Sequence, residues 1–303
     1  MAWPSLCSAM MSKRRRLWSP VRRGLVEMLF ACLLFSLMNA CVYAIQLFEA
    51  GVSATVISFV RVSSNLLILL TVAVFNGRVL ALFGDGRPSL WLRGLFGALA
   101  LMLSFAAITR IGPGESAFLT ASSGVFVALL SPFVLGQKSS WLMWLAILGS
   151  FTGVILLFRP DEPGVDFLGK GMALLSGFLS ALAYLMVARA GRSNRPQSVI
   201  FYFCLVAMLI HLAFFAYSGC EWPKMVATWG LLLATGVLGS GAQYFMTRAY
   251  QLSPAALVSA VGYLVPVLSL AWGVCFFGQI PGHTALAGTA LIMLFGVLLP
   301  FLK

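Results

Sequence analysis

The chain has 303 residues, of which 61% are hydrophobic and only 9% are charged, and its formal net charge is +12 at pH 7. A soluble domain of this length cannot hide so much apolar surface, because its exterior must be largely polar. This composition excludes an ordinary soluble protein. It predicts an all-α integral membrane protein, because the apolar runs are long and continuous rather than alternating as in a membrane barrel.

The first 23 residues form a basic tail before the first apolar run. The sequence Lys13-Arg14-Arg15-Arg16 looks like the beginning of a secretory signal. However, the apolar run from Gly24 is about 20 residues long and further membrane segments follow, so we expect an uncleaved first helix. Met1, Met10 and Met11 are all compatible with the start of translation.

Hydropathy and turn signals predict ten transmembrane helices. Each apolar run has a length suited to a bilayer core, and clusters of Pro, Gly and charged residues separate the runs. The predicted spans are 24–44, 55–75, 94–110, 115–135, 141–158, 169–188, 198–217, 228–247, 254–277 and 284–302. An even number of spans places both termini on the same side of the membrane.

The distribution of Lys and Arg sets the orientation of these spans. With the N-terminus in the cytoplasm, most of the 20 basic residues fall on the inner side. This agrees with the positive-inside rule and predicts an inner-membrane protein with both termini cytoplasmic. Arg93 is assigned to the inner side by this count, and Arg61 lies within a span. The basic tail is therefore interpreted as a topology signal, and no nucleic-acid partner is expected.

Neither a metal nor a cofactor is expected. The six cysteines are scattered, with no CxxC and no metal-ligand spacing, and they are Cys7, Cys32, Cys41, Cys204, Cys220 and Cys275. The chain has no Walker A motif, so ATP is not the direct driver of any activity. An integral membrane enzyme remains an alternative of another class, but it would need convergent acids, histidines or a nucleophile–base pair. A non-transporting membrane interaction protein is a third alternative.

The chain repeats itself weakly at an offset of about 142 residues. Gly94-Leu95-Phe96-Gly97 corresponds to Gly236-Val237-Leu238-Gly239, and Gly136-Gln137 corresponds to Gly278-Gln279. An odd number of spans in each half would give the two halves opposite orientations in the membrane. Inverted repeats of this kind are typical of secondary transporters, whose substrate site lies at the repeat interface near the midplane.

Several short motifs occur in a distinctive order along the chain. They are Phe59-Val60-Arg61 in the second span, then Ala249-Tyr250-Gln251-Leu252-Ser253-Pro254-Ala255, Pro266-Val267 and Gly278-Gln279. In these segments the chain resembles the drug/metabolite transporter superfamily, specifically its ten-helix EamA-type members, from about Gly24 to Leu302. The resemblance implies two inverted five-helix repeats around a central cavity. The corresponding divisions are a tail at 1–23, a first repeat at 24–158, an outer linker at 159–168 and a second repeat at 169–303.

One departure from the family pattern concerns coupling. The family often has Glu after the glycine that ends spans four and nine, whereas this chain has Gln137 and Gln279. We therefore expect no role in coupling or structure for a carboxylate at these two positions of this chain. The deep positions of the spans contain no acid, so movement down a gradient or exchange is favoured over proton antiport.

Polar side chains recur on one face of several spans and must face protein or water rather than lipid. Their Ser and Thr members are expected chiefly to bond neighbouring helices. Arg61, roughly 10 Å deep at 1.5 Å per residue, is expected to attract an anionic group of the substrate, or else to bond backbone carbonyls or snorkel outward. The candidate substrate-binding residues are Asn39, Tyr43, Arg61, Asn65, Ser123, Tyr184, Tyr202, Gln243 and Tyr263, and the candidate hinge residues are Gly124 and Pro266.

These observations together predict a secondary active or facilitative transporter of small polar metabolites that works by alternating access. The expected partners are a small-molecule substrate and the lipid bilayer; a monomer is sufficient, and a homodimer is allowed. The resemblance and Arg61 favour an exporter of amino acids or amino-acid-derived metabolites, including opine-type metallophores. Uptake of a vitamin, nucleoside or similar metabolite remains the alternative.

Overall fold

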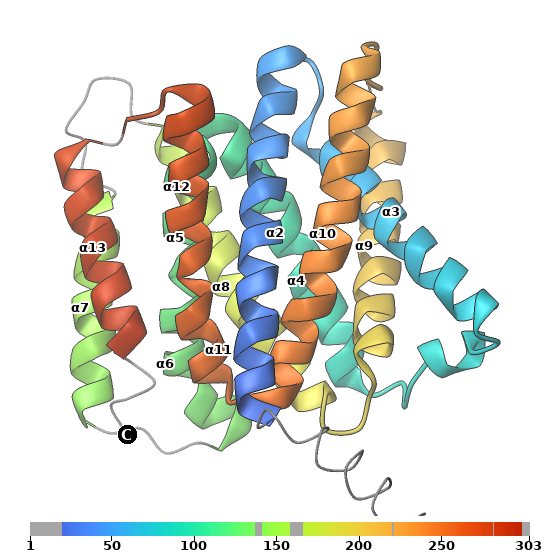
Figure 1. The fold of residues 1–303 in the computed structure, drawn as a ribbon, viewed down its shortest axis with the longest axis horizontal. Coiled ribbons are helices and arrows are strands. Elements are labelled where there is room, and N and C mark those ends of the chain that lie inside the picture. The colour runs from blue at the N-terminus through green and yellow to red at the C-terminus, as the bar shows by residue number, and fades with distance from the viewer. Residues whose placement is uncertain (1–19, 137–140, 158–165, 220, 281, 299–303) are drawn as a thin grey trace, which may run out of the picture.

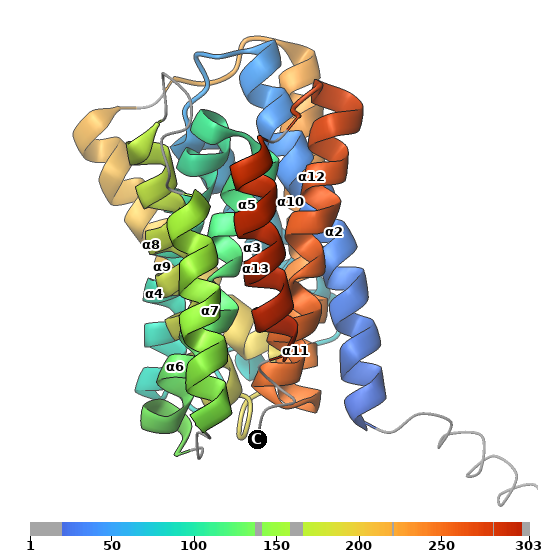
Figure 2. The ribbon, with the colours of Figure 1, turned by 90° about the vertical axis from the view of Figure 1, so that its left-hand side faces the viewer.

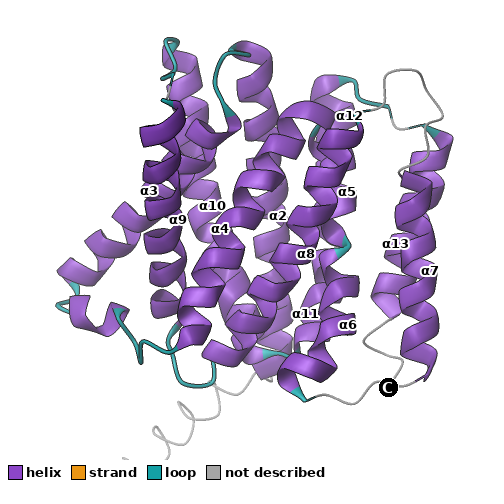
Figure 3. Cartoon of the chain, turned by 180° about the vertical axis from the view of Figure 1, so that it is seen from behind, coloured by secondary structure: helices purple, strands orange, loops and turns teal. Residues whose placement is uncertain are grey.

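The structure is a computed structural model that describes residues 20–136, 141–157, 166–219, 221–280 and 282–298. Within these residues every regular element is a helix, and the helices form one bundle (Figures 1 and 3). The elements are α2 (Pro20–Phe48), α3 (Ala54–Phe75), η1 (Val79–Leu82), α4 (Pro88–Ile111), α5 (Pro113–Ala121), α6 (Ser123–Leu135), α7 (Trp141–Leu157), α8 (Phe167–Ala190), α9 (Pro196–Ser218), α10 (Val226–Leu252), α11 (Ala255–Gly262), α12 (Leu264–Phe277) and α13 (His283–Leu298).

Each predicted span coincides with one helix or with two consecutive short helices. The fourth span is α5 followed by α6, and the ninth is α11 followed by α12. Among the described residues, seven of these units are long and apolar enough to cross a membrane, namely α2, α3, α4, α5 with α6, α8, α9, and the run Leu257–Phe277. The other units are α7 and α13, with 17 and 16 residues, and α10, in which small and polar residues interrupt the apolar sequence.

The surface of the bundle carries many large apolar side chains, and its mainly apolar interior also holds polar groups. On the outer face of α3, Leu67 is 66% exposed and Phe75 is 86% exposed. In contrast, Ser36, Ser58 and Ser176 are completely buried. Large exposed apolar side chains around an interior that holds polar groups are the pattern of a protein surrounded by lipid. The chain is therefore a multi-pass membrane protein.

The two halves of the chain pack through reciprocal pairs of helices. The helix α2 lies along α10 as α8 lies along α4, and α3 contacts α10 as α9 contacts α4. Helices at the same position of each half also meet, since α3 contacts α9 and α7 contacts α13. The last pair stands together at one edge of the bundle (Figures 1 and 2). Exchanging the two halves therefore leaves the contact pattern nearly unchanged.

The direction of the chain differs between the two halves. The helix α2 begins, and α13 ends, at the lower end of the bundle (Figures 1 and 2). The helix α8 begins at the opposite end, where Asp166 accepts a hydrogen bond from the amide of Gly169 and caps the helix. There Asp166 also pairs with Arg110 near the C-terminal end of α4, with Nε and Oδ2 2.6 Å apart.

Two buried charges near the ends of the bundle, Glu27 and Lys170, are paired. Glu27 in α2 is buried, and its Oε1 lies 2.9 Å from a guanidinium nitrogen of Arg248 in α10. Lys170 in α8 is buried as well, and its Nζ lies 2.9 Å from Oε1 of Glu115 in α5. A buried charge is costly unless it has a partner, so these pairs are what is expected of a stable bundle.

The two broken helices are interrupted at equivalent positions of the halves, at Ser122 between α5 and α6 and at Tyr263 between α11 and α12. Pro266 has no N–H to donate to the carbonyl of Gly262 four residues earlier, which accounts for the second break. At the first break, the Ser122 amide bonds the Leu119 carbonyl only three residues back, at 3.2 Å.

Candidate functional site

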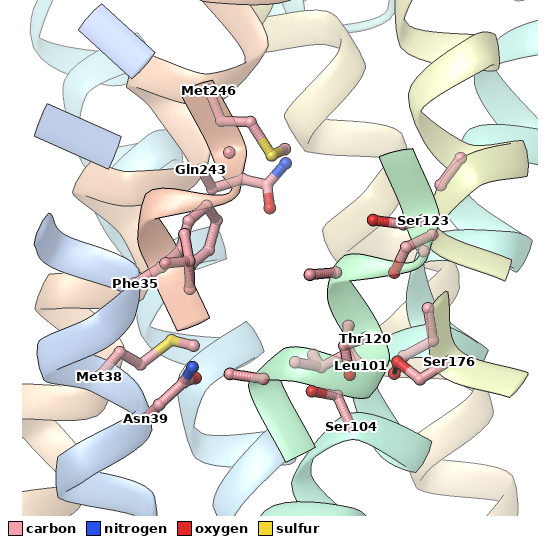
Figure 4. Close-up of a pocket in the computed structure, with 18 of the residues that line it drawn as sticks. Phe35, Met38, Asn39, Leu101, Ser104, Thr120, Ser123, Ser176, Gln243 and Met246 are labelled. Carbon is pink, nitrogen blue, oxygen red and sulfur yellow. Dashed lines mark hydrogen bonds between the residues drawn. The ribbon is translucent and has the colours of Figure 1, made fainter. Parts of the chain in front are cut away.

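A cavity lies between the two halves of the chain. Its wall comes mainly from α2, α4, α5 and α8, with two residues each from α10 and α12 and single residues from α3, α6, α9 and α11. Figure 4 shows side chains of α2 and α10, such as Asn39 and Gln243, facing Ser104, Thr120 and Ser123 across an open space. The cavity thus lies where residues of both halves meet.

Several polar side chains of the cavity wall are held by neighbouring helices. The hydroxyl of Ser176 donates to the carbonyl of Ala100 at 2.8 Å, and Nδ2 of Asn39 donates to Oγ of Ser269 in α12 at 3.3 Å. Bonds of this kind join packed helices in lipid, as expected for the Ser and Thr positions. They also fix polar side chains at the cavity wall in defined positions.

Arg61 lines the cavity and is only 3% exposed. Its Cζ lies 5.7 Å from the ring centroid of Phe203 and 6.0 Å from that of Phe105. Gly239 in α10 makes room for this side chain, because a Cβ at that position would lie 2.6 Å from Nε of Arg61. Insertion scales give an Arg at the centre of a membrane helix a cost of about 2.5 to 3.5 kcal/mol, so the group requires compensation.

A second arginine, Arg93, lines the same cavity and is also 3% exposed. The sequence predicts that the third span begins at residue 94, which would place Arg93 on the cytoplasmic side. The helix α4 begins at Pro88 instead, so Arg93 lies in its second turn and faces inward. Its Cζ lies 4.8 Å from the ring centroid of Phe203. A proline followed by the apolar residues Leu90, Trp91 and Leu92 is the sequence signal that would have extended the span.

Neither arginine of the cavity has a counterion among the described residues. Within the part of the chain that the structure describes, Arg61 and Arg93 form no ion pair and no hydrogen bond, and the Nε atom of each is buried without a partner. Aromatic faces stabilise a cation only partly, by about 0.5 to 2 kcal/mol. The cavity therefore carries two positive charges that a bound anion would neutralise.

Five of the nine candidate substrate-binding residues line the cavity: Asn39, Arg61, Ser123, Tyr184 and Gln243. The Tyr184 ring stacks on that of Tyr250, with the centroids 5.1 Å apart and the planes 20° from parallel. Gln243 bonds the hydroxyl of Thr247 on its own helix at 3.5 Å.

The other four candidates lie outside the cavity wall. The Tyr202 hydroxyl donates to the carbonyl of Phe83 at 3.1 Å, and the Tyr43 ring packs edge-on against Phe277 with the centroids 5.0 Å apart. Tyr263 and Asn65 are buried in the bundle. Successive residues on a helix point about 100° apart, so in α9 it is Phe203 rather than Tyr202 that faces the cavity.

The predicted hinge residues lie close to the two helix breaks. Pro266 lines the cavity three residues after Tyr263, and Gly124 follows Ser122 by two residues. The ring of Tyr263 lies against Gly124, where an added Cβ would lie 2.7 Å from the tyrosine hydroxyl. The two breaks are therefore in contact with each other through this pair.

Gln279 is one of the two glutamines at the positions where the family often has a carboxylate. The side-chain amide of Gln279 covers Gly112 at the turn between α4 and α5, where φ is +82° and a Cβ would lie 2.5 Å from Nε2. Gln279 thus packs against the turn that leads into α5. Gln137 lies outside the described residues.

Asp166 and Glu49 are two of the carboxylates in the connections whose pKa values are lowered. The amide N–H of Gly169 and then the guanidinium of Arg110 lower the pKa of Asp166. The backbone amide of Lys224 is the largest cause of the lowered pKa of Glu49, whose Oε1 it meets at 2.8 Å. Both groups connect helices of different halves, and both bonds favour the ionised carboxylate.

Comparisons with known proteins agree with this geometry. The model of the EamA-like transporter family matches residues 23–159 and again residues 167–301. A pseudopaline exporter of Pseudomonas aeruginosa is 29% identical over 273 residues, which cover 90% of this chain and 94% of that protein. A riboflavin transporter of Vibrio cholerae is 24% identical, over 90% and 91% of the respective chains. One crystal structure shares the fold with a TM-score of 0.68 at 17% identity, over 91% of this chain and 96% of that chain.

Proposed function

Because this chain belongs to the EamA-like transporter family of the drug/metabolite transporter superfamily, we propose that it moves small polar metabolites across the membrane by alternating access. The observation that carries the proposal is the cavity between the two halves, whose wall includes two arginines and several uncharged polar side chains and which lies beside the two helix breaks. The family and the relatives are transporters, which supports transport over an enzymatic role.

We propose that the chain crosses the membrane ten times as two inverted repeats. The double match to the family model, the reciprocal helix contacts and the opposite directions of α2 and α8 support this arrangement. The helices α7 and α13 are about 24 to 26 Å long at 1.5 Å per residue, slightly less than a bilayer core of about 30 Å. They contact each other, so each is shielded on one side by its equivalent. A single chain encloses the cavity, so a monomer is sufficient for the mechanism.

The proposed location is the inner membrane, with both termini in the cytoplasm. The support is the excess of Lys and Arg on one side of the ten spans. In the structure, α2 begins and α13 ends at the same end of the bundle, as this topology requires. Asp166, just before α8, and Glu115, in the first turn of α5, would then lie on the outer side.

The proposed substrates are amino acids or amino-acid-derived metabolites, including opine-type metallophores, and the proposed direction is outward. Similarity to a pseudopaline exporter along nearly the whole chain supports both parts. The cavity supports the substrate class, because Arg61 can bind a carboxylate while Asn39 and Gln243 offer amides to polar groups.

We propose that the substrate moves down its own gradient or is exchanged for another solute, rather than being driven by proton antiport. Among the described residues that line the cavity, none is Asp, Glu or His. A buried carboxylate that titrates is the usual device of a proton-coupled transporter. His211 is fully buried in contact with Ser58 Oγ at 2.6 Å and the Ala207 carbonyl at 2.6 Å, away from the cavity wall.

A second candidate is the uptake of a vitamin with a planar ring. Two observations favour it: the relatives include a riboflavin transporter, and Phe35, Phe105, Tyr184 and Phe203 line the cavity. Aromatic rings of this kind can stack on a planar ligand. The uncompensated arginines favour an acidic metabolite instead.

The experiment that tests the proposal compares metabolites in the medium and inside cells, with and without expression of the chain. An exporter depletes its substrate from the cells and enriches it in the medium, whereas an uptake transporter does the reverse. Arg61→Gln is the matched variant and should abolish the change. If neither compartment changes for any metabolite, and purified protein in liposomes moves none of the compounds tried, the transport proposal is wrong.

A further inference from the structure

The two arginines of the cavity form one unit around a shared aromatic ring. Cζ of Arg93 lies 4.8 Å and Cζ of Arg61 lies 5.7 Å from the ring centroid of Phe203. The two guanidinium carbons are therefore no farther apart than the sum of these distances. This separation is within the reach of one small molecule that carries two anionic groups.

Each arginine is given space by a glycine, and the two glycines are equivalent in the two halves. Gly97 lies one turn after Arg93 in α4, and a Cβ there would collide with the Arg93 guanidinium and lie 3.0 Å from the Phe203 ring. Gly239 does the same for Arg61, since its Cβ would lie 2.6 Å from Nε. The repeated scaffold thus leaves room for both charged side chains on the wall of the cavity.

Two other cations within the bundle, the buried Lys170 and the partly buried Arg248, differ sharply from Arg61 and Arg93. Lys170 has Glu115 at 2.9 Å, and Arg248 has Glu27 at 2.9 Å. Within the described ranges, Arg61 and Arg93 have no such carboxylate, and the lining of the cavity that holds them contains no acid. Among the described residues, Lys170 and Arg248 thus have a carboxylate partner and the two arginines of the cavity do not.

We propose that Arg61 and Arg93 together bind a substrate with two carboxylates, one for each guanidinium. The argument is charge balance: a substrate with one negative charge would leave one guanidinium buried without a counterion, whereas a dicarboxylate neutralises both. A guanidinium and a carboxylate match in shape and form two parallel hydrogen bonds. This proposal rests on the proposed transport function and names its substrate class as amino-acid-derived dicarboxylates.

Binding to purified protein in chloride-free buffer tests the site independently of transport. The probes are L-glutamate with its monoamide L-glutamine, and iminodiacetate with its monoamide, each pair differing by one negative charge. The measured quantity is the concentration of each probe that is needed to raise the thermal unfolding temperature of the protein. We expect at least one diacid to act at a concentration about tenfold lower than its monoamide, as the loss of a charged pair in a dry site would give. Arg61→Gln and Arg93→Gln should each reduce that preference to less than about threefold.

Stability without a ligand separates binding arginines from structural ones. Replacing an uncompensated buried cation by an apolar residue of similar size removes a desolvation cost. Arg61→Met and Arg93→Met are therefore expected to raise the unfolding temperature of the empty protein while abolishing its response to the diacid. Arg93→Lys keeps the charge and should keep part of the preference. Arg248→Gln is the control: it removes one partner of the buried Glu27, should lower the unfolding temperature, and should leave the diacid preference intact.

Three results would overturn the two-carboxylate proposal. They are an equal or absent response to the diacids and their monoamides, an unchanged preference in both Arg→Gln variants, and a lower unfolding temperature for both Arg→Met variants. The proposed transport function fails separately. If the protein prefers diacids but moves none of them across the membrane of liposomes, the binding site is supported and the transport function is contradicted. If it transports metabolites that carry one charge but shows no preference for diacids, the transport function is supported and the two-carboxylate site is contradicted.

Discussion

Arg61 in α3 and Phe203 in α9 occupy the same position in the two repeats, 142 residues apart, and their side chains meet. The guanidinium carbon lies 5.7 Å from the ring centroid. Equivalent residues can touch only near the pseudo-symmetry axis of the repeats, which is where inverted-repeat transporters place their substrate site. Here the two repeats have diverged at that position, one supplying the charge and the other the ring.

Substitution of Phe203 tests the role of this ring. Phe203→Leu keeps an apolar side chain but removes the aromatic face that both Arg61 and Arg93 contact. A cation–π contact of about 1 kcal/mol corresponds to roughly a fivefold change in affinity. We expect the KM for an anionic substrate to rise about fivefold in liposome flux, with a smaller change in maximal rate. An unchanged KM would mean that the ring does not position the arginines.

Gly97 offers a way to move Arg93 without removing its charge. In Gly97→Ala the new methyl group occupies the space of the Arg93 guanidinium, and this flexible side chain must shift. We expect weaker binding of anionic ligands with little loss of fold stability. The control is Gly230→Ala in α10, where a Cβ would meet nothing within 4 Å. That variant should bind normally and gain up to about 1 kcal/mol in stability from helix propensity. Equal behaviour of the two variants would contradict this account.

Pro266 tests the broken helix as a hinge. Pro266→Ala restores an N–H that can bond the Gly262 carbonyl and join α11 to α12. We expect a higher unfolding temperature together with a lower flux, because the straightened helix resists the change of shape that transport requires. Measuring both quantities on the same preparation is essential. A variant that gains stability and keeps full flux would show that the break is structural only.

Asp166 gives a prediction on pH. Its pKa in the folded protein is lowered by the Gly169 amide and by Arg110, below an unfolded value of about 3.9. Its contribution to stability is therefore present above pH 4 and is lost as the pH falls through the folded pKa. Asp166→Ala should cost about 1 kcal/mol at pH 7 through loss of the helix cap, and less at pH 3.

The matched variant Asp166→Asn separates the cap from the ion pair. Asn caps helices about as well as Asp but cannot pair with Arg110. It should therefore lose only the smaller, salt-dependent part of the stability, which is under about 1 kcal/mol for an exposed pair. Thermal unfolding in detergent at low and high salt measures both variants. Equal losses for Ala and Asn would assign the whole effect to the charge.

Much of the helical framework could be predicted from the sequence. Long apolar runs and Pro–Gly turns located each long helix and each pair of broken helices, but not the short helix η1. The constant repeat offset predicted that the halves would correspond. Arg93 was missed because the charge itself was taken as the boundary of its span, although Pro88 marks the true start of α4. Hydropathy alone cannot distinguish an arginine at a membrane surface from one that a cavity solvates.

The cavity wall was predictable only in part, because polarity indicates that a residue is inside the bundle but not what it faces. Tyr202 is polar and buried, yet its hydroxyl bonds the Phe83 carbonyl behind the cavity wall. Phe203 gave no polar signal, and its position opposite Arg61 depends on how the two repeats pack. Information of that kind is tertiary and lies in no single helix.

The central claim is that a cavity between the two repeats opens alternately to the two sides of the membrane. Cysteine labelling tests it most directly, since it needs no knowledge of the substrate. In a variant with its six natural cysteines replaced, Ser123→Cys places a thiol on the cavity wall. A maleimide that cannot cross the membrane is applied to right-side-out and to inside-out vesicles. We predict labelling from both sides, and labelling from one side only would contradict the account.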